Sequence, residues 1–319
     1  MDDKLPLHSL LVSKKTIISF MISFLILYLL INNINLTEFM NISKNISWPI
    51  YLAAFGLHYS SFIVRGMRWK KLLDALKIKT NSLAVTEIVF LSWFANSIVP
   101  AKIGDIYRSY LLKKETDEPI SKTIGTIVVE RIFDITLLLI LLTLSGYLIY
   151  SDQMPEEIDQ SLTIGYILII VVAFGIIVFW AFEKRMMHLI PEKLHMHFRN
   201  LSHGIFKPFS DFETIFYVFT MSLLIWIMES GRLFLVTRSI GLDIGIYTIV
   251  FVALASTLLT AIPLTPAGLG AVEFSIVFLL ELSGVDTTFG TAVAFLDRVI
   301  SFWSLLVSGT IVYLLRNKK

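Results

Sequence analysis

The chain has 319 residues, of which 55% are hydrophobic, and its mean hydropathy of +0.75 is typical of a protein that crosses a membrane several times. Its longest polar interval, about residues 183–213, is far shorter than the roughly 100 residues that a soluble catalytic domain usually needs. The formal charge of +2 does not indicate a nucleic-acid partner, and the absence of cysteine excludes disulfides, thiolate metal sites and thiol nucleophiles.

Six apolar stretches are long enough to span a bilayer. They are residues 16–36, 48–65, 122–150, 162–182, 214–237 and 288–315. The first follows two lysines, as a signal peptide does, but no small-residue cleavage site follows it, so we predict a transmembrane helix. Two further apolar regions, 82–113 and 246–283, are broken by proline and glycine, which favours a re-entrant helical hairpin in each.

The predicted fold is therefore an all-α polytopic membrane protein, with six transmembrane helices plus two re-entrant helical hairpins in a single domain, 1–319. Loop charge sets the orientation, because lysine and arginine are retained on the cytoplasmic side. The loop after the second span, 65–79, and the segment 183–207 are basic, whereas 151–160 is acidic. Both chain termini are expected in the cytoplasm of a prokaryotic cell, with the protein in its plasma membrane.

Three landmarks recur in the two halves of the chain. Pro100-Ala-Lys-Ile-Gly104 matches Pro266-Ala-Gly-Leu-Gly270, with a glycine and an arginine upstream and an acid–arginine pair downstream at nearly equal spacing. Since the charge rule gives the halves opposite orientations, residues 48–150 and 214–315 are predicted to form an inverted repeat. Such repeats with paired broken helices favour a midplane substrate site and alternating access. Chance similarity between apolar hairpins is the alternative.

Ionisable residues are unusually frequent inside the predicted spans, where each costs roughly 2.5 to 3.5 kcal/mol on insertion scales. Glu130 and Asp134 share a helix face at i, i+4, and Glu229 and Arg232 share one at i, i+3. One reading is that the acid–arginine pairs lock the two halves together. The other is that the arginines receive an anionic head group, because a guanidinium binds phosphate with a bidentate fork.

The helices that begin after the two broken regions are expected to direct backbone N–H groups and positive dipole ends towards the protein interior. Glycines there let the backbone approach a ligand, although the motif also fits a simple hairpin tip. Glu273 follows within a turn and can either pair with an arginine or take a proton. The predicted substrate-binding residues are Arg65, Arg68, Pro100, Asp105, Arg108, Glu130, Arg131, Asp134, Glu229, Arg232, Pro266, Gly268, Gly270, Glu273, Asp297 and Arg298.

No motif for a nucleophile elbow, a phosphate-binding loop or a zinc protease is present, and we predict neither enzymatic activity nor a cofactor. Four histidines, at positions 188, 195, 197 and 203, lie in an amphipathic segment without a supporting carboxylate pattern. We interpret them as solvated or interfacial side chains and predict no metal site.

Five motifs, in order along the chain, resemble the flippase-like transmembrane domain of lysylphosphatidylglycerol synthases. They are residues 65–73, RGMRWKKLL; 96–108, NSIVPAKIGDIYR; 129–134, VERIFD; 263–273, PLTPAGLGAVE; and Asp297-Arg298. The resemblance covers nearly the whole chain and implies translocation of an anionic or modified lipid, or of a lipid-linked precursor. The aminoacyl-transferase domain of the synthases and the glycosyltransferase domain of some archaeal relatives are not matched, so their reactions are not carried over.

The predicted function is therefore a flippase- or scramblase-like transporter of a phosphate-bearing lipid. Its partners are membrane lipids, anionic or linked to polyprenyl phosphate, with no nucleic acid; a homo-oligomer or a lipid-modifying enzyme is a further partner to consider. The rival is a non-transporting scaffold for a lipid-modifying or glycosyl-transferring enzyme. A third reading, an intramembrane hydrolase, lacks a recognisable nucleophile and base. Proton coupling through a buried carboxylate and passive scrambling both remain open.

Overall fold

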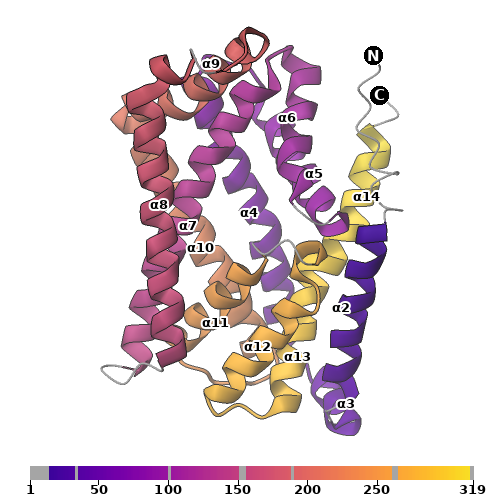
Figure 1. The fold of residues 1–319 in the computed structure, drawn as a ribbon. Coiled ribbons are helices and arrows are strands. Elements are labelled where there is room, and N and C mark those ends of the chain that lie inside the picture. The colour runs from indigo at the N-terminus through magenta and orange to yellow at the C-terminus, as the bar shows by residue number, and fades with distance from the viewer. Residues whose placement is uncertain are drawn as a thin grey trace. The chain divides into compact units, whose positions relative to one another are not determined.

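In the computed structural model the chain is helical (Figure 1), with no β-strand in the ranges described, which are residues 14–32, 35–99, 102–150, 156–187, 190–260 and 265–316. The helices are α2 (Lys14–Asn32), α3 (Leu36–Lys44), α4 (Trp48–Ala75), α5 (Ser82–Ile98), α6 (Ile103–Thr116), α7 (Ile120–Tyr150), α8 (Glu156–Met187), α9 (Glu192–Phe206), α10 (Phe212–Ser239), α11 (Ile246–Leu259), α12 (Ala271–Leu282), α13 (Thr287–Arg298) and α14 (Ser304–Arg316). The all-α prediction is confirmed.

Four helical segments of the described chain are long and apolar enough to cross a membrane. They are Ile120–Tyr150, Ile158–Phe182, Phe212–Ser239 and Thr287–Arg316. The last combines α13 and α14 through a π-helical turn, Val299–Trp303, that begins directly after Arg298. The predicted spans 16–36 and 48–65 lie largely on α2 and α4, which are helical but are not among these four.

The basic segment after the second predicted span is helical for most of its length, which corrects the prediction of a loop over 65–79. Helix α4 continues without interruption to Ala75, and the sequence from Arg65 to Ala75 contains no proline and only one glycine to end it. Arg65 and Arg68 are buried, with 6% and 2% of their surface exposed. These two arginines are therefore interior residues of a helix and not loop residues.

Each broken region forms two helices, one on either side of the break. In the first, α5 ends at Ile98 and α6 begins at Ile103, and Pro100 lies outside the described residues. In the second, a short 3-10 turn, η2 (Pro266–Gly268), lies between α11 and α12. Helices therefore flank each break as the sequence predicts.

The chain divides into two compact units. Unit 1 comprises residues 1–62, 90–107 and 226–319, and unit 2 comprises 63–89 and 108–225. In unit 1, α12 packs against α11, α13 and α2, and a cluster that includes Leu233, Ile249, Ile276 and Ala294 forms its core.

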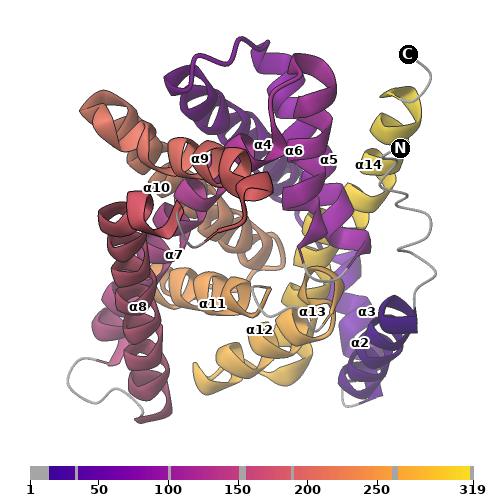
Figure 2. The same ribbon diagram turned by 45° about the horizontal axis from the view of Figure 1, so that its top comes forward.

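In unit 2, α9 packs across α7 and also contacts α8, as Figure 1 and Figure 2 both show. The close crossing of α7 and α9 depends on two facing glycines: a Cβ added to Gly125 would lie 2.7 Å from backbone atoms of Gly204. Small residues at a crossing let helix backbones approach closely. This contact holds the amphipathic helix α9 against the N-terminal part of α7, close in sequence to Glu130 and Arg131.

Candidate functional site

Arg68 on α4 occupies the centre of unit 2 and binds both acidic residues of α7. Its Nε donates to Oε1 of Glu130 at 3.2 Å, its Nη2 donates to Oδ2 of Asp134 at 3.3 Å, and its Nη1 also donates to Asp134. Nη1 further donates to the hydroxyl of Ser222 on α10 at 2.7 Å. The prediction that Glu130 and Asp134 share one helix face is confirmed, because one guanidinium reaches both.

Two further arginines reach the same carboxylates. Nη2 of Arg108 on α6 lies 2.6 Å from Oε2 of Glu130, and its guanidinium stands over the ring of Trp69 at 4.9 Å. Arg131 lies on α7 itself, with Nη1 3.3 Å from Oδ2 of Asp134. Its side chain is 30% exposed, whereas those of Arg68 and Arg108 are 3% and 4% exposed. Arg131 is therefore the accessible cation of this group.

We call the group formed by Arg65, Arg68, Arg108, Arg131, Glu130 and Asp134 the arginine centre. Arg65 is buried one helical turn before Arg68 and acts electrostatically on Asp134. As defined, the centre holds four guanidinium groups and two carboxylates. A guanidinium binds phosphate or carboxylate through paired N–H donors, so the centre offers side chains suited to an anionic ligand.

Unit 1 holds a corresponding pair. Arg232 on α10 donates from Nε to Oδ1 of Asp297 at 2.8 Å and from Nη2 to Oδ2 at 3.2 Å. Its Nη1 donates to Glu229 one turn earlier, which confirms the predicted i, i+3 pair, and approaches Nδ1 of His58 at 3.3 Å. In both units, therefore, an arginine before the broken region pairs with the acid of the acid–arginine motif after it.

The arginine of the second acid–arginine motif makes a different contact. Arg298 donates from Nε to Oε1 of Glu273 at 2.9 Å and from Nη2 to the carbonyl oxygen of Ala267 at 3.0 Å. Glu273 accepts the N–H of Gly270 through Oε2 at 2.7 Å. Of the two roles left open for Glu273, the structure contains the arginine pair. Pro266 and Gly268 lie within the same turn.

The ion pairs described here join residues of the same predicted repeat. Glu130 pairs with Arg68 and Arg108, and Asp297 pairs with Arg232. The interpretation that the two acid–arginine motifs pair with each other and lock the two halves together stays a prediction. Asp105 lies in the first turn of α6 and is half-buried.

Some of the side chains that contact the charged site were not predicted, and Ser222, His58 and Trp69 are examples. Ser222 contacts Arg68 and His58 contacts Arg232, and both are buried. A lone histidine inside the apolar run 48–65 was a usable signal for His58, whereas a serine in the run 214–237 carries none. Within the described ranges, no group of three or more acidic or histidine side chains is placed to hold a metal ion.

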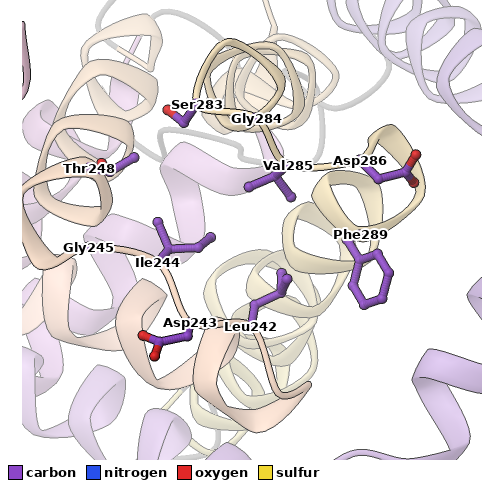
Figure 3. A pocket seen from close by; sticks show the side chains of 10 residues that line it. All are labelled: Leu242, Asp243, Ile244, Gly245, Thr248, Ser283, Gly284, Val285, Asp286 and Phe289. Atoms are coloured by element: carbon purple, nitrogen blue, oxygen red, sulfur yellow. The ribbon is translucent and has the colours of Figure 1, made fainter.

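A cavity of about 400 Å³ lies elsewhere in unit 1 (Figure 3). Asp243 in the loop between α10 and α11 and Asp286 in the loop between α12 and α13 line it, together with Thr248 of α11 and Phe289 of α13. None of the predicted site residues lines this cavity, so it is a surface feature distinct from the buried charges.

A family model described as the lysylphosphatidylglycerol synthase TM region matches residues 16–309. The chain belongs to this family. The family model spans the described arginines of both units, from Arg65 to Arg298, and it confirms the resemblance found in the motifs. The family assignment makes this chain an integral membrane protein, in agreement with its four apolar spanning helices.

Proteins with similar sequences occur in archaea. A UPF0104 membrane protein of Methanocaldococcus jannaschii is 38% identical over 223 residues, which cover 69% of this chain and 93% of that protein. A UPF0104 membrane protein of Methanothermobacter thermautotrophicus is 26% identical over 285 residues, covering 83% of this chain and 82% of that protein. Glycosyltransferase AglD of Haloferax volcanii is 22% identical over 310 residues, covering 86% of this chain but 50% of AglD. No solved structure matches the chain.

Proposed function

We propose that this protein moves an anionic, phosphate-bearing lipid or lipid-linked precursor between the two leaflets of a membrane, as a flippase- or scramblase-like transporter. The observation that carries the proposal is the arginine centre, in which Arg68 and Arg108 are buried inside a membrane protein. Ionisable side chains within the membrane are rare and mark substrate or ion pathways. A guanidinium recognises phosphate through two parallel N–H donors, and Arg131 is exposed enough to meet a head group first.

The proposed architecture has six transmembrane helices and two re-entrant hairpins, with 48–150 and 214–315 as inverted repeats. The corresponding pairs Arg68–Glu130 and Arg232–Asp297 support this arrangement, because each joins equivalent landmarks. So do the apolar helices α5 and α11, which at 17 and 14 residues are shorter than the four spanning helices. An inverted repeat with paired broken helices is the architecture of many alternating-access transporters.

The test is leaflet exchange of fluorescent lipids with different head groups in proteoliposomes. Wild type is compared with Arg131→Ala and Arg298→Ala. Rapid exchange of anionic but not zwitterionic lipids, lost in both variants, is the expected result. Unchanged exchange in both variants would remove the basis of the proposed path. Polyprenyl phosphates are included as a second lipid class.

The second candidate is a non-transporting scaffold that anchors a lipid-modifying or glycosyl-transferring enzyme. The similarity to AglD favours it, because the matched region makes up half of a protein named a glycosyltransferase. The exposed lysines of the basic segment 65–79, such as Lys77 and Lys79, are the proposed docking surface. Absence of exchange for every lipid, polyprenyl phosphates included, would favour this role.

We assign the protein to the cell membrane of a prokaryote, with both described ends of the chain on the cytoplasmic side, since the basic segments lie there by the charge rule. We assign it no chemical reaction and no cofactor of its own. Anionic or polyprenyl-phosphate-linked lipids are the proposed partners, and a second copy or a lipid-modifying enzyme is the proposed protein partner.

A further inference from the structure

One arginine ties the turn between α11 and α12 to the next helix, α13. Arg298 donates to the carbonyl oxygen of Ala267 inside the turn at 3.0 Å and to Oε1 of Glu273 on α12 at 2.9 Å. Oε2 of Glu273 accepts the N–H of Gly270 at 2.7 Å. The ion pair of Arg298 and Glu273 thus connects the end of α13 to the turn and to the first residues of α12.

The backbone of this turn needs such support. Ala267 has φ +47°, a left-handed conformation that a residue with a Cβ rarely adopts, and Gly268 and Gly270 have φ +70° and +88°. Residues in sparsely populated conformations persist only where their surroundings hold them. The hydrogen bond from Arg298 is made to the strained residue itself. Loss of that bond would therefore favour rearrangement of the turn over rearrangement of the flanking helices.

The partner of Arg298 is an internal anion. Both carboxylate oxygens of Glu273 face the guanidinium, with Nη2 3.5 Å from Oε2, and the two side chains are 7% and 2% exposed. A phosphate would engage the same donors with two of its oxygens. An anion bound to the same Nε–Nη2 edge of Arg298 would replace Glu273 there, and this would leave a buried carboxylate without its counter-charge. Movement of the turn would then return Glu273 to a polar environment.

The two broken regions differ in the charge they present. In the first, α6 presents Arg108 to the acid Glu130; in the second, α12 presents Glu273 to Arg298. In the second region, the carboxylate of Glu273 therefore occupies the guanidinium of Arg298 as an anionic ligand would.

We propose that Arg298 and Glu273 form a latch that holds the turn at residues 265–270 closed, and that an anionic lipid head group opens this turn by replacing Glu273 on Arg298. This inference rests on the proposed function, because its ligand is the transported head group. It assigns Glu273 a role as an internal competitor of the substrate.

The absence of native cysteine allows a direct test by maleimide labelling of single cysteines in nanodiscs. Thr265→Cys, 7% exposed at the start of the turn, reports opening; Thr291→Cys, fully buried on α13, reports loss of fold. In phosphatidylcholine, labelling of the Thr265→Cys reporter should be slow. Adding Glu273→Gln should speed it about tenfold or more, since a charge-assisted hydrogen bond is lost. Phosphatidylglycerol should speed labelling with the latch intact, but should add nothing in Glu273→Gln or Arg298→Lys.

Equal labelling rates with and without Glu273→Gln would overturn the latch, and insensitivity of the intact protein to phosphatidylglycerol would overturn the head group as its ligand. If Glu273→Gln also exposes the Thr291→Cys reporter, that variant is unfolded. The labelling rates of Thr265→Cys with Arg298→Lys then test the latch in its place. Leaflet exchange in matching vesicles separates the two proposals. Exchange without a labelling response removes the latch alone, whereas a labelling response without exchange retains the latch and removes transport.

Discussion

Arg68 and Glu130 lie 62 residues apart in the chain and are joined by a 3.2 Å hydrogen bond from Nε to Oε1. Arg232 and Asp297, 65 residues apart, make the equivalent bond at 2.8 Å. Each bond connects the helix before a broken region to the helix after it, inside one unit. The broken region is thereby bracketed by a buried ion pair, which holds its two neighbouring helices together.

Replacement of Arg68 should destabilise unit 2 strongly. Arg68→Gln leaves Glu130 and Asp134 buried with less positive charge, and breaking a buried pair in this way typically costs about 3–5 kcal/mol. The measurement is thermal unfolding in detergent micelles. Lys70→Gln is the matched control on the same helix, because Lys70 and Asp74 are 20% and 49% exposed and such a pair contributes about 0–1 kcal/mol. Equal losses of stability in the two variants would contradict the buried pair.

The second pair should behave as a coupled unit in a double-mutant cycle. Arg232→Gln, Asp297→Asn and the double variant should give a coupling energy of about 1 kcal/mol or more, as expected for contacting charged residues. Arg238 and Asp243 provide the comparison, since they pair at 2.7 Å but are 39% and 82% exposed. Additive effects for Arg232 and Asp297 would show that the contact contributes nothing to stability.

The helices were predictable because apolar runs and helix breakers are local properties of the sequence. The misassigned segment was 65–75, where lysine and arginine are loop signals in a membrane protein but also good helix formers, and helix α4 continues. Spacing along one helix was sufficient to predict that Glu130 and Asp134 share a face. The partners across the fold were not predictable, because contacts such as Arg68–Ser222 join residues 154 positions apart.

The crossing of α7 and α9 should not tolerate a methyl group. A Cβ at Gly204 would lie 2.1 Å from the carbonyl oxygen of Lys122, so Gly204→Ala must push the helices apart, at a cost of about 1–3 kcal/mol typical of overpacking. Gly175→Ala is the control in α8, where nothing lies within 4 Å and alanine should stabilise the helix by about 0.5–1 kcal/mol. Thermal unfolding of both variants should therefore shift in opposite directions. A neutral Gly204→Ala would contradict the close crossing.

Acidification should weaken the packing of α9. Partial desolvation, with Lys122 and Lys207 nearby, holds the pKa of the exposed His203 below its usual value of 6.5. The unfolded chain then binds more protons than the folded protein, so the contribution of neutral His203 to stability is present above the unfolded pKa and is lost as pH falls below it. The thermal midpoint of wild type should decline between pH 7.5 and about pH 5.5 more steeply than that of His203→Asn. Parallel pH profiles would exclude His203 as the group responsible.

Replacement of Arg131 should slow lipid exchange without reducing the stability of the fold. Its side chain is 30% exposed, and Asp134 keeps its hydrogen bonds to Arg68 when Arg131 is replaced. Arg131→Gln should therefore change the free energy of unfolding by less than about 1 kcal/mol, as for other partly exposed pairs. Exchange of anionic lipid should nevertheless slow by about tenfold, because one charge-assisted contact to the phosphate is lost.

The control is Arg199→Gln, which removes an exposed arginine of α9 in the same unit and should leave exchange unchanged. Equal slowing in both variants would assign the effect to surface charge, and loss of stability in Arg131→Gln would assign it to the fold. Slowing restricted to Arg131→Gln would place the phosphate at the accessible edge of the arginine centre.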